Sequence, residues 1–201
     1  MYKLTNAMIQ NLEKDLKIFH SLFRGGRCEA WQLEELVVRA IKSDHKKSER
    51  VDWIGRGHDV DKDVQIIETN DKVNDIQIKS GKIEKSNMVV SGHRLGRFKE
   101  DLSKITEFLN LNKYDTFLIP YCEEEDELGK RFIYKIFYAD SNIFKIDNKW
   151  ESKIGKKGGE TFFTQNSKGV KIFLRPSMSW QIWYEIPLSI LTNFTREIIL
   201  K

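Results

Sequence analysis

The chain has 201 residues, of which 40% are hydrophobic and 32% charged. This length suits one domain with its own core, and the balance of residue types excludes disordered, fibrous and membrane-embedded proteins. The net charge of +4, from 34 basic and 30 acidic side chains, permits a nucleic-acid partner but does not argue for one. Two isolated cysteines, Cys28 and Cys122, exclude a zinc ribbon and a disulfide framework. We expect a cytoplasmic protein, since the sequence has no apolar signal core and no membrane span.

The hydrophobic pattern predicts helices first and strands later. Hydrophobic residues repeat at helical spacing over residues 7–23, 28–42 and 97–110, and the polar residues 43–52 read as a loop. Strands are expected at 64–67, 76–79, 114–121, 132–137, 170–174 and 181–186, the first two forming a hairpin. This order predicts an α/β (α+β-like) fold in which helices flank a mixed central sheet. We expect a single domain over residues 1–201.

The predicted hairpin carries the residues best suited to chemistry. Residues two apart on a strand point to the same face, so Gln77 and Lys79 project together while Ile76 and Ile78 enter the core. Asp63 opens the neighbouring strand, and a short hairpin would bring its carboxylate near both side chains. The hairpin therefore predicts a small polar cluster.

Such a cluster suits a hard cation. Mg²⁺ prefers oxygen ligands and keeps several waters, and a carboxylate, an amide oxygen and a backbone carbonyl can hold it. Here these would come from Asp63, Gln77 and Ile78. A bound ion stabilises charge on a phosphate and lowers the pKa of water, and Lys79 could orient that water.

The spacing of Asp63, Gln77 and Lys79 resembles the PD-(D/E)xK nuclease core, in the variant form Q-x-K. Gln77 brings no charge, so a second carboxylate is expected from elsewhere. Glu34 lies on the predicted apolar stripe of Trp31, Val38 and Ile41, and buried carboxylates are rare unless paired or metal-bound. The resemblance also implies a helical glutamate beside the metal. We expect this to be Glu34, with Glu35 as the alternative.

Two further segments resemble type II restriction endonucleases. The run GRGHDVDKDVQI is similar to their GSH-x-x-G-x-D-I segment, which aligns His58 with the histidine and Asp63 with the metal-binding aspartate. Asp61 remains an alternative to Asp63. After Lys79-Ser80-Gly81, the segment VSGHRL resembles their iSg-x-R-L segment. The resemblance covers about residues 28–110, within a nuclease core expected at about 28–120.

Target recognition is expected at about 90–110 and 140–190. Arginine, lysine, serine and glutamine side chains contact phosphates and read base edges. A solvated helix start is the alternative interpretation near 94–99, and Trp180 and Trp183 are more typical of a core than of base stacking. The candidate DNA-binding residues are His58, Ser91, His93, Arg94, Arg97, Lys99, Arg175, Ser177, Ser179 and Gln181.

The resemblance implies a Mg²⁺-dependent type II restriction enzyme that cuts both strands of a short double-stranded DNA site. It also implies a homodimer, because a palindromic site shares its two-fold axis with the protein, and a partner methyltransferase in the host. No nucleotide cofactor is expected, since the sequence has no P-loop. Two alternatives stay open: a repair or junction nuclease on the same core, and a non-catalytic DNA-binding module.

Overall fold

The computed structural model describes residues 2–23, 26–45, 49–54, 62–98, 100–111, 114–127, 129–155, 159–191 and 194–200. Contacts divide the chain into two compact units. The first unit comprises Met1–Ser80, Tyr114–Asp140 and Asn193–Lys201, and the second comprises Gly81–Lys113 and Ser141–Thr192. The expected nuclease core at 28–120 has residues in both units, and the expected recognition ranges fall almost wholly in the second.

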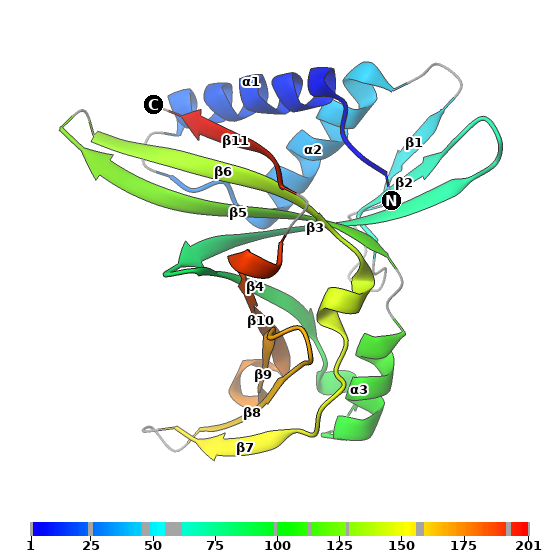
Figure 1. Cartoon of the computed structure of the whole chain (residues 1–201), viewed down its shortest axis with the longest axis vertical. Helices are drawn as coiled ribbons and strands as arrows, with labels where there is room; N and C mark the ends of the chain where they lie inside the picture. The colour runs from blue at the N-terminus through cyan, green and yellow to red at the C-terminus, as the bar shows by residue number, and fades with distance from the viewer. Residues whose placement is uncertain are drawn as a thin grey trace. The chain divides into compact units, whose positions relative to one another are not determined.

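The first unit is a sheet with two helices on one face (Figure 1). Its strands run in the order β11-β6-β5-β3-β2-β1. The helices are α1 (Asn6–Leu22) and α2 (Ala30–Asp44), and the strands are β1 (Arg50–Trp53), β2 (Val64–Ile67), β3 (Val73–Glu84), β5 (Asp115–Asp126), β6 (Gly129–Ala139) and β11 (Phe194–Leu200). The chain therefore has the predicted mixed α/β architecture, a central mixed sheet flanked by helices.

The core of the first unit lies between α1, α2 and the sheet. Helix α1 begins where the Thr5 hydroxyl accepts a hydrogen bond from the Met8 backbone N–H at 3.1 Å. Leu12 and Leu16 of this helix are fully buried and pack in one cluster with α2 and with the central strands. Burying one such leucine contributes about 1.5–3 kcal/mol, so the apolar stripes hold both helices on the sheet.

The second unit contains strands in the order β3-β4-β10-β9-β8-β7, and β3 contributes its C-terminal residues. Its strands are β4 (Asn87–Arg94), β7 (Glu151–Ile154), β8 (Glu160–Gln165), β9 (Lys171–Arg175) and β10 (Gln181–Pro187), and its α-helix is α3 (Leu102–Asn110). Asn110 ties α3 to the chain through two hydrogen bonds with the Ile146 backbone, at 2.9 and 2.8 Å.

Most of the predicted elements are confirmed. The two N-terminal helices, the hairpin and the strands that became β5, β6, β9 and β10 occur within a few residues of their predicted ranges. The helix predicted at 97–110 begins later, because Asp101 accepts hydrogen bonds from the Ser103 and Lys104 backbone N–H groups and caps α3. The predicted loop 43–52 is wrong at both ends, where α2 reaches Asp44 and β1 starts at Arg50.

No helix in the described part of the chain is both long enough and apolar enough to cross a membrane.

Gly81, in the segment Lys79-Ser80-Gly81, is a position where only glycine fits. A Cβ atom there would overlap the backbone carbonyl of Val89 on β4. We predict that Gly81→Ala lowers the free energy of unfolding by about 1–3 kcal/mol, measured by urea denaturation, because the backbone of β4 must shift. Gly159→Ala is the control, since a Cβ there meets nothing within 4 Å. Equal effects of the two substitutions would contradict this account.

Candidate active site

Helix α2 positions Glu34. The helix begins after Glu29, whose backbone N–H donates a hydrogen bond to Gln32 Oε1 at 2.9 Å. Leu33 is buried in the core, the neighbouring Glu34 is half-buried, and Glu35 is exposed. Of the two candidate glutamates, Glu34 is therefore the one at the border of the buried face.

The apolar stripe that predicts Glu34 differs from the observed one at its N-terminal end. Val38 and Ile41 are buried as expected, but Trp31 is 60% exposed. Trp31 lies in the first turn, and the buried face of α2 starts at Leu33. Glu34 thus adjoins the buried face without lying at its centre, which accounts for its partial burial.

The hairpin of β2 and β3 holds the Asp63 carboxylate against β3. The Asp63 backbone N–H donates to the Ile76 carbonyl at 2.9 Å, where the two strands begin to pair. The Ile78 backbone N–H donates to Asp63 Oδ2 at 2.6 Å. This second bond fixes the carboxylate beside the backbone that connects Gln77 with Lys79.

The residues next to Asp63 reinforce the hairpin. Asp75 Oδ1 accepts a hydrogen bond from Gln65 Nε2 at 2.8 Å and forms an ion pair with Lys62 Nζ at 2.9 Å. All three side chains are half-buried. These contacts cross from β2 and the residue preceding Asp63 to β3, so they restrict movement of Asp63 relative to β3.

Asp63 and Lys79 lie close enough to Glu34 to change the pKa of its carboxyl group. Burial, followed by the negative charge of Asp63, raises the pKa of the Glu34 carboxyl to about 7, and Lys79 opposes this rise. Burial also raises the pKa of Asp63, whereas Lys79 and the Ile78 N–H act to lower it. The three side chains come from α2, from the residue that precedes β2, and from β3. We refer to them as the Glu34–Asp63–Lys79 cluster.

Gln77 lies deeper than predicted. Ile76 and Ile78 are buried in the core as expected, but Gln77 is itself only 3% exposed. Both faces of β3 are therefore covered at this point, whereas the alternating pattern predicts one open face. Lys79, two residues further on, is half-buried and contributes its charge to the cluster.

The donor set of the cluster fits a magnesium ion. Two carboxylates that repel each other in a partly buried place favour a bound proton or cation, and their oxygens are ligands that Mg²⁺ prefers. Among the described residues, no group of three or more His, Cys, Asp or Glu side chains could hold a metal. A Mg²⁺ ion at this cluster would therefore have only two carboxylate ligands, Glu34 and Asp63. The Ile78 carbonyl, water and substrate would supply its other oxygen ligands.

All candidate DNA-binding residues that the structure describes lie in the second unit. His58 and Lys99 lie outside the described residues, as does Asp61, the alternative to Asp63. The residues of this set that the structure describes are Ser91, His93, Arg94, Arg97, Arg175, Ser177, Ser179 and Gln181. They belong to a different unit from the Glu34–Asp63–Lys79 cluster.

Three of these residues form one row across strands of the second unit. Gln181 on β10 pairs with Arg94 on β4 and with Arg175 on β9. Residues directly opposite on antiparallel strands point to the same face, so the three side chains share a face of the sheet. Arg94 and Arg175 are exposed.

The other members of the set are more scattered. Arg97 lies over the Phe108 ring at 4.7 Å, and the His93 ring is 5.6 Å from the same ring, so both pack on α3. Ser177 lies in a short 3-10 helix, and Ser179 follows it with φ of 57°, a left-handed turn. Both serines are exposed.

Charge is divided unequally between the two units, a feature that the net charge of the chain conceals. The sequence of the second unit has 15 basic and 8 acidic residues, a net charge of +7. That of the first has 19 basic and 22 acidic residues, a net charge of −3. Counting charges by segment along the sequence would have revealed this difference once the units were known.

No protein-family model, curated protein or solved structure matches the chain. A functional assignment therefore depends on the geometry of the cluster, the division of charge and the sequence motifs.

The raised pKa of Glu34 predicts a pH-dependent gain in stability from Glu34→Gln. The folded state holds the proton more tightly than the unfolded state, so the wild type loses stability as pH rises from about 4.5 to about 7. In EDTA at pH 8 we expect the variant to be more stable by on the order of 1 kcal/mol, after allowance for solvent screening.

Urea denaturation at pH 4.5 and pH 8 measures this difference, which should vanish at the lower pH. Glu35→Gln is the matched control on the same helix, because Glu35 is exposed. A gain that is equal at both pH values, or equal in the two variants, would contradict a buried charge at Glu34.

Proposed function

We propose that the chain is a Mg²⁺-dependent endonuclease that hydrolyses phosphodiester bonds in double-stranded DNA, with a PD-(D/E)xK-type site in the first unit. The observation that carries this proposal is the convergence of Glu34, Asp63 and Lys79 from three separate segments of the chain. Two carboxylates and one ammonium group are what this chemistry needs, and perturbed pKa values are typical of functional sites.

Each residue of the cluster has a defined part in this reaction. A bound Mg²⁺ supplies neutralisation of the charge on the phosphate and a lower pKa for the attacking water. Glu34 and Asp63 hold the ion through their oxygens. The Ile78 N–H keeps Asp63 in place through its 2.6 Å bond. The Lys79 ammonium orients the water. The water oxygen bonds to phosphorus and releases a proton to solvent as one P–O ester bond breaks, and the leaving oxygen takes up a proton from solvent.

The second unit supports a DNA substrate. Its net charge of +7 suits the phosphate backbone, and the row of Arg94, Gln181 and Arg175 offers donors for phosphates and base edges. Together with the motifs at 55–66 and 90–95, this favours a type II restriction enzyme that acts as a homodimer on a short site. Sequence-specific cleavage and dimerisation are both parts of the proposal.

A second candidate is a non-catalytic DNA-binding module. The observation that favours it is Gln77, which is uncharged and buried where the motif has an acid. This candidate shares the DNA substrate but predicts no cleavage, so the experiment below separates the two.

Cleavage of long duplex DNA tests the proposed activity. With Mg²⁺ we expect discrete fragments on a gel, and with EDTA none. Lys79→Ala should lower the cleavage rate by roughly 10²- to 10⁴-fold, because the attacking water loses its positioning group. Duplex affinity, measured in EDTA, should be nearly unchanged. Lys72→Ala is the matched control, an exposed lysine on the same hairpin that pairs with Glu68.

Other outcomes would favour a different function for the protein. A Mg²⁺-dependent smear, or cleavage only at junctions or ends, would favour a repair or junction nuclease on the same core. Binding without cleavage in every variant would favour the module. Wild-type cleavage that persists in Lys79→Ala would remove Lys79 from the mechanism.

Thermal unfolding tests the metal site without relying on activity. Mg²⁺ should raise the melting temperature of the wild type, because an ion that binds only the folded state stabilises it by mass action. Asp63→Asn and Glu34→Gln should each reduce that rise, and Glu35→Gln should preserve it. A rise that is identical in all four proteins would place the ion elsewhere.

A further inference from the structure

A single row of paired residues crosses five strands of the second unit and contains three aromatic side chains. Glu151 on β7 pairs with Phe163 on β8, and Phe163 pairs with Phe173 on β9. Phe173 pairs with Trp183 on β10, and Trp183 pairs with Ser91 on β4. Directly paired residues share a face, so the three rings lie side by side on one face of the sheet. We call Phe163, Phe173 and Trp183 the aromatic row.

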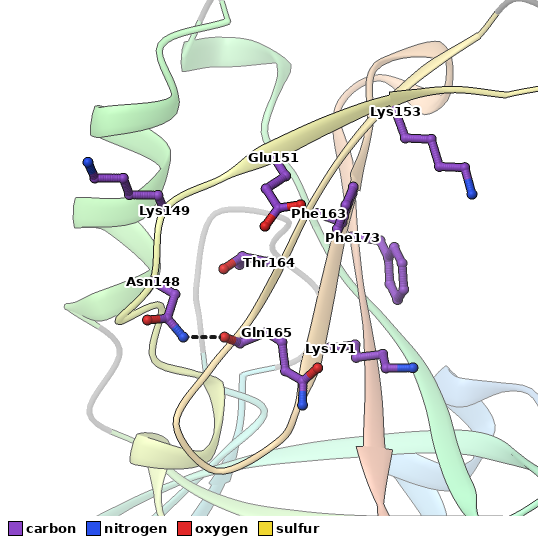
Figure 2. A pocket seen from close by; sticks show the side chains of 9 residues that line it. All are labelled: Asn148, Lys149, Glu151, Lys153, Phe163, Thr164, Gln165, Lys171 and Phe173. Carbon is purple, nitrogen blue, oxygen red and sulfur yellow. Dashed lines mark hydrogen bonds between the residues drawn. The ribbon is translucent and has the colours of Figure 1, made fainter.

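The face that carries the aromatic row is the more open of the two. The alternate residues of β9 and β10 are buried, among them Leu174, Ile182 and Tyr184, and the Tyr184 ring contacts Phe144 at 4.9 Å. The three members of the aromatic row are instead half-buried. Phe163 and Phe173 line a hollow of about 610 Å³ that extends toward β7 (Figure 2).

Cationic side chains flank the aromatic row. Lys171 and Arg175 lie two residues to either side of Phe173 on β9, so they share its face, and both are exposed. The Arg175 guanidinium lies 5.2 Å from the centre of the Trp183 ring. Figure 2 shows the side chains of Lys153, Phe173 and Lys171 extending to the same side of the strands.

Acidic residues on this face are fewer than basic residues. Glu151 ends the row on β7, and Glu185 pairs with Lys171 across the strands. The surrounding unit has a net charge of +7, which opposes docking of a second copy of the same unit and favours a polyanion.

We propose that this face binds single-stranded nucleic acid, with unpaired bases stacked on the aromatic row and phosphates bound by Lys153, Lys171 and Arg175. A duplex covers the faces of its bases and presents only their edges, so aromatic rings on an open sheet are complementary to unpaired bases. Adjacent strands lie about 4.8 Å apart, which gives each ring its own position along an extended strand. This surface shares Arg175 with the row proposed for duplex DNA, but it does not depend on the Glu34–Asp63–Lys79 cluster, and binding needs no metal.

Fluorescence anisotropy in EDTA tests the proposal with the full chain. The probes are labelled oligothymidylate and oligouridylate of about 12 nucleotides, within the range one such surface occupies, together with a hairpin duplex. We expect both single strands to bind, and Phe173→Leu to weaken their binding more than it weakens binding of the duplex. The comparison of the two single-stranded probes shows whether DNA or RNA is preferred.

Phe173→Leu should weaken single-strand binding by roughly 5- to 150-fold, because leucine keeps an apolar side chain but offers no ring for stacking. Lys171→Gln should reduce the salt dependence of binding, lowering the slope of log K against log salt by about 0.7. Phe162→Leu is the matched control. Phe162 is the neighbouring residue on β8, but it pairs with Leu174 on the other face and stacks on Trp180 at 5.6 Å.

Absence of saturable single-strand binding at low salt would overturn the proposal. So would an unchanged affinity of Phe173→Leu, an equal loss in Phe162→Leu, or a loss of duplex binding in Phe173→Leu as large as its loss of single-strand binding. Photocrosslinking of the wild type to an oligonucleotide with 5-iodouracil avoids any folding defect of the variants. Adducts on Phe163, Phe173 or Trp183 would support the proposal, and adducts confined to other residues would overturn it. Loss of DNA cleavage in Lys79→Ala would leave this binding intact, so the two proposals fail independently.

Discussion

The hydrogen bond from the Ile78 backbone N–H to Asp63 is the constraint on which the candidate site depends. Asp63 precedes the first residue of β2, where a side chain is otherwise free to turn toward solvent. The 2.6 Å bond turns its carboxylate toward β3 instead, one residue away from Lys79. Once Asp63 is fixed there, Glu34 needs only the partial burial that α2 gives it to complete the cluster. A backbone donor is well suited to this task because it keeps its position when side chains rearrange.

The cluster brings the carboxylates of Glu34 and Asp63 together in a partly buried place, although like charges repel each other. Burial and the charge of Asp63 both oppose ionisation of Glu34, so the fold is less stable when this carboxyl group is ionised. Gln77 fits this balance. A carboxylate at a position only 3% exposed would add a third buried charge, whereas the amide adds none. The neutral residue therefore lets the strand remain buried on both faces beside the two acids.

The sequence predicted the helices and the hairpin because their hydrophobic periods are strong and local. The predicted hairpin also placed Asp63 near Lys79, and the structure brings these two charges together. The exposed strand β7 was missed because no side chain in it is buried, so it shows no period.

Strand β4 and the aromatic row were beyond sequence reasoning for another reason. The register between β4 and β10 shifts between Gln181 and Trp183. This irregularity places Ser91 opposite Trp183, on the same face of the sheet. Which residues meet across five strands depends on registers set by tertiary pairing. Trp183, typical of a core by its residue type, is half-buried on the open face for that reason.

The division of charge between the units has a consequence for how the protein first meets a polyanion. A polyanion is attracted by a unit of charge +7 and repelled by one of charge −3, so the encounter favours the second unit before contacts form. Such steering raises association rates by about 10- to 10³-fold and weakens as salt shortens the Debye length, which is about 8 Å at physiological ionic strength. The modest net charge of +4 therefore understates the attraction between the second unit and a polyanion.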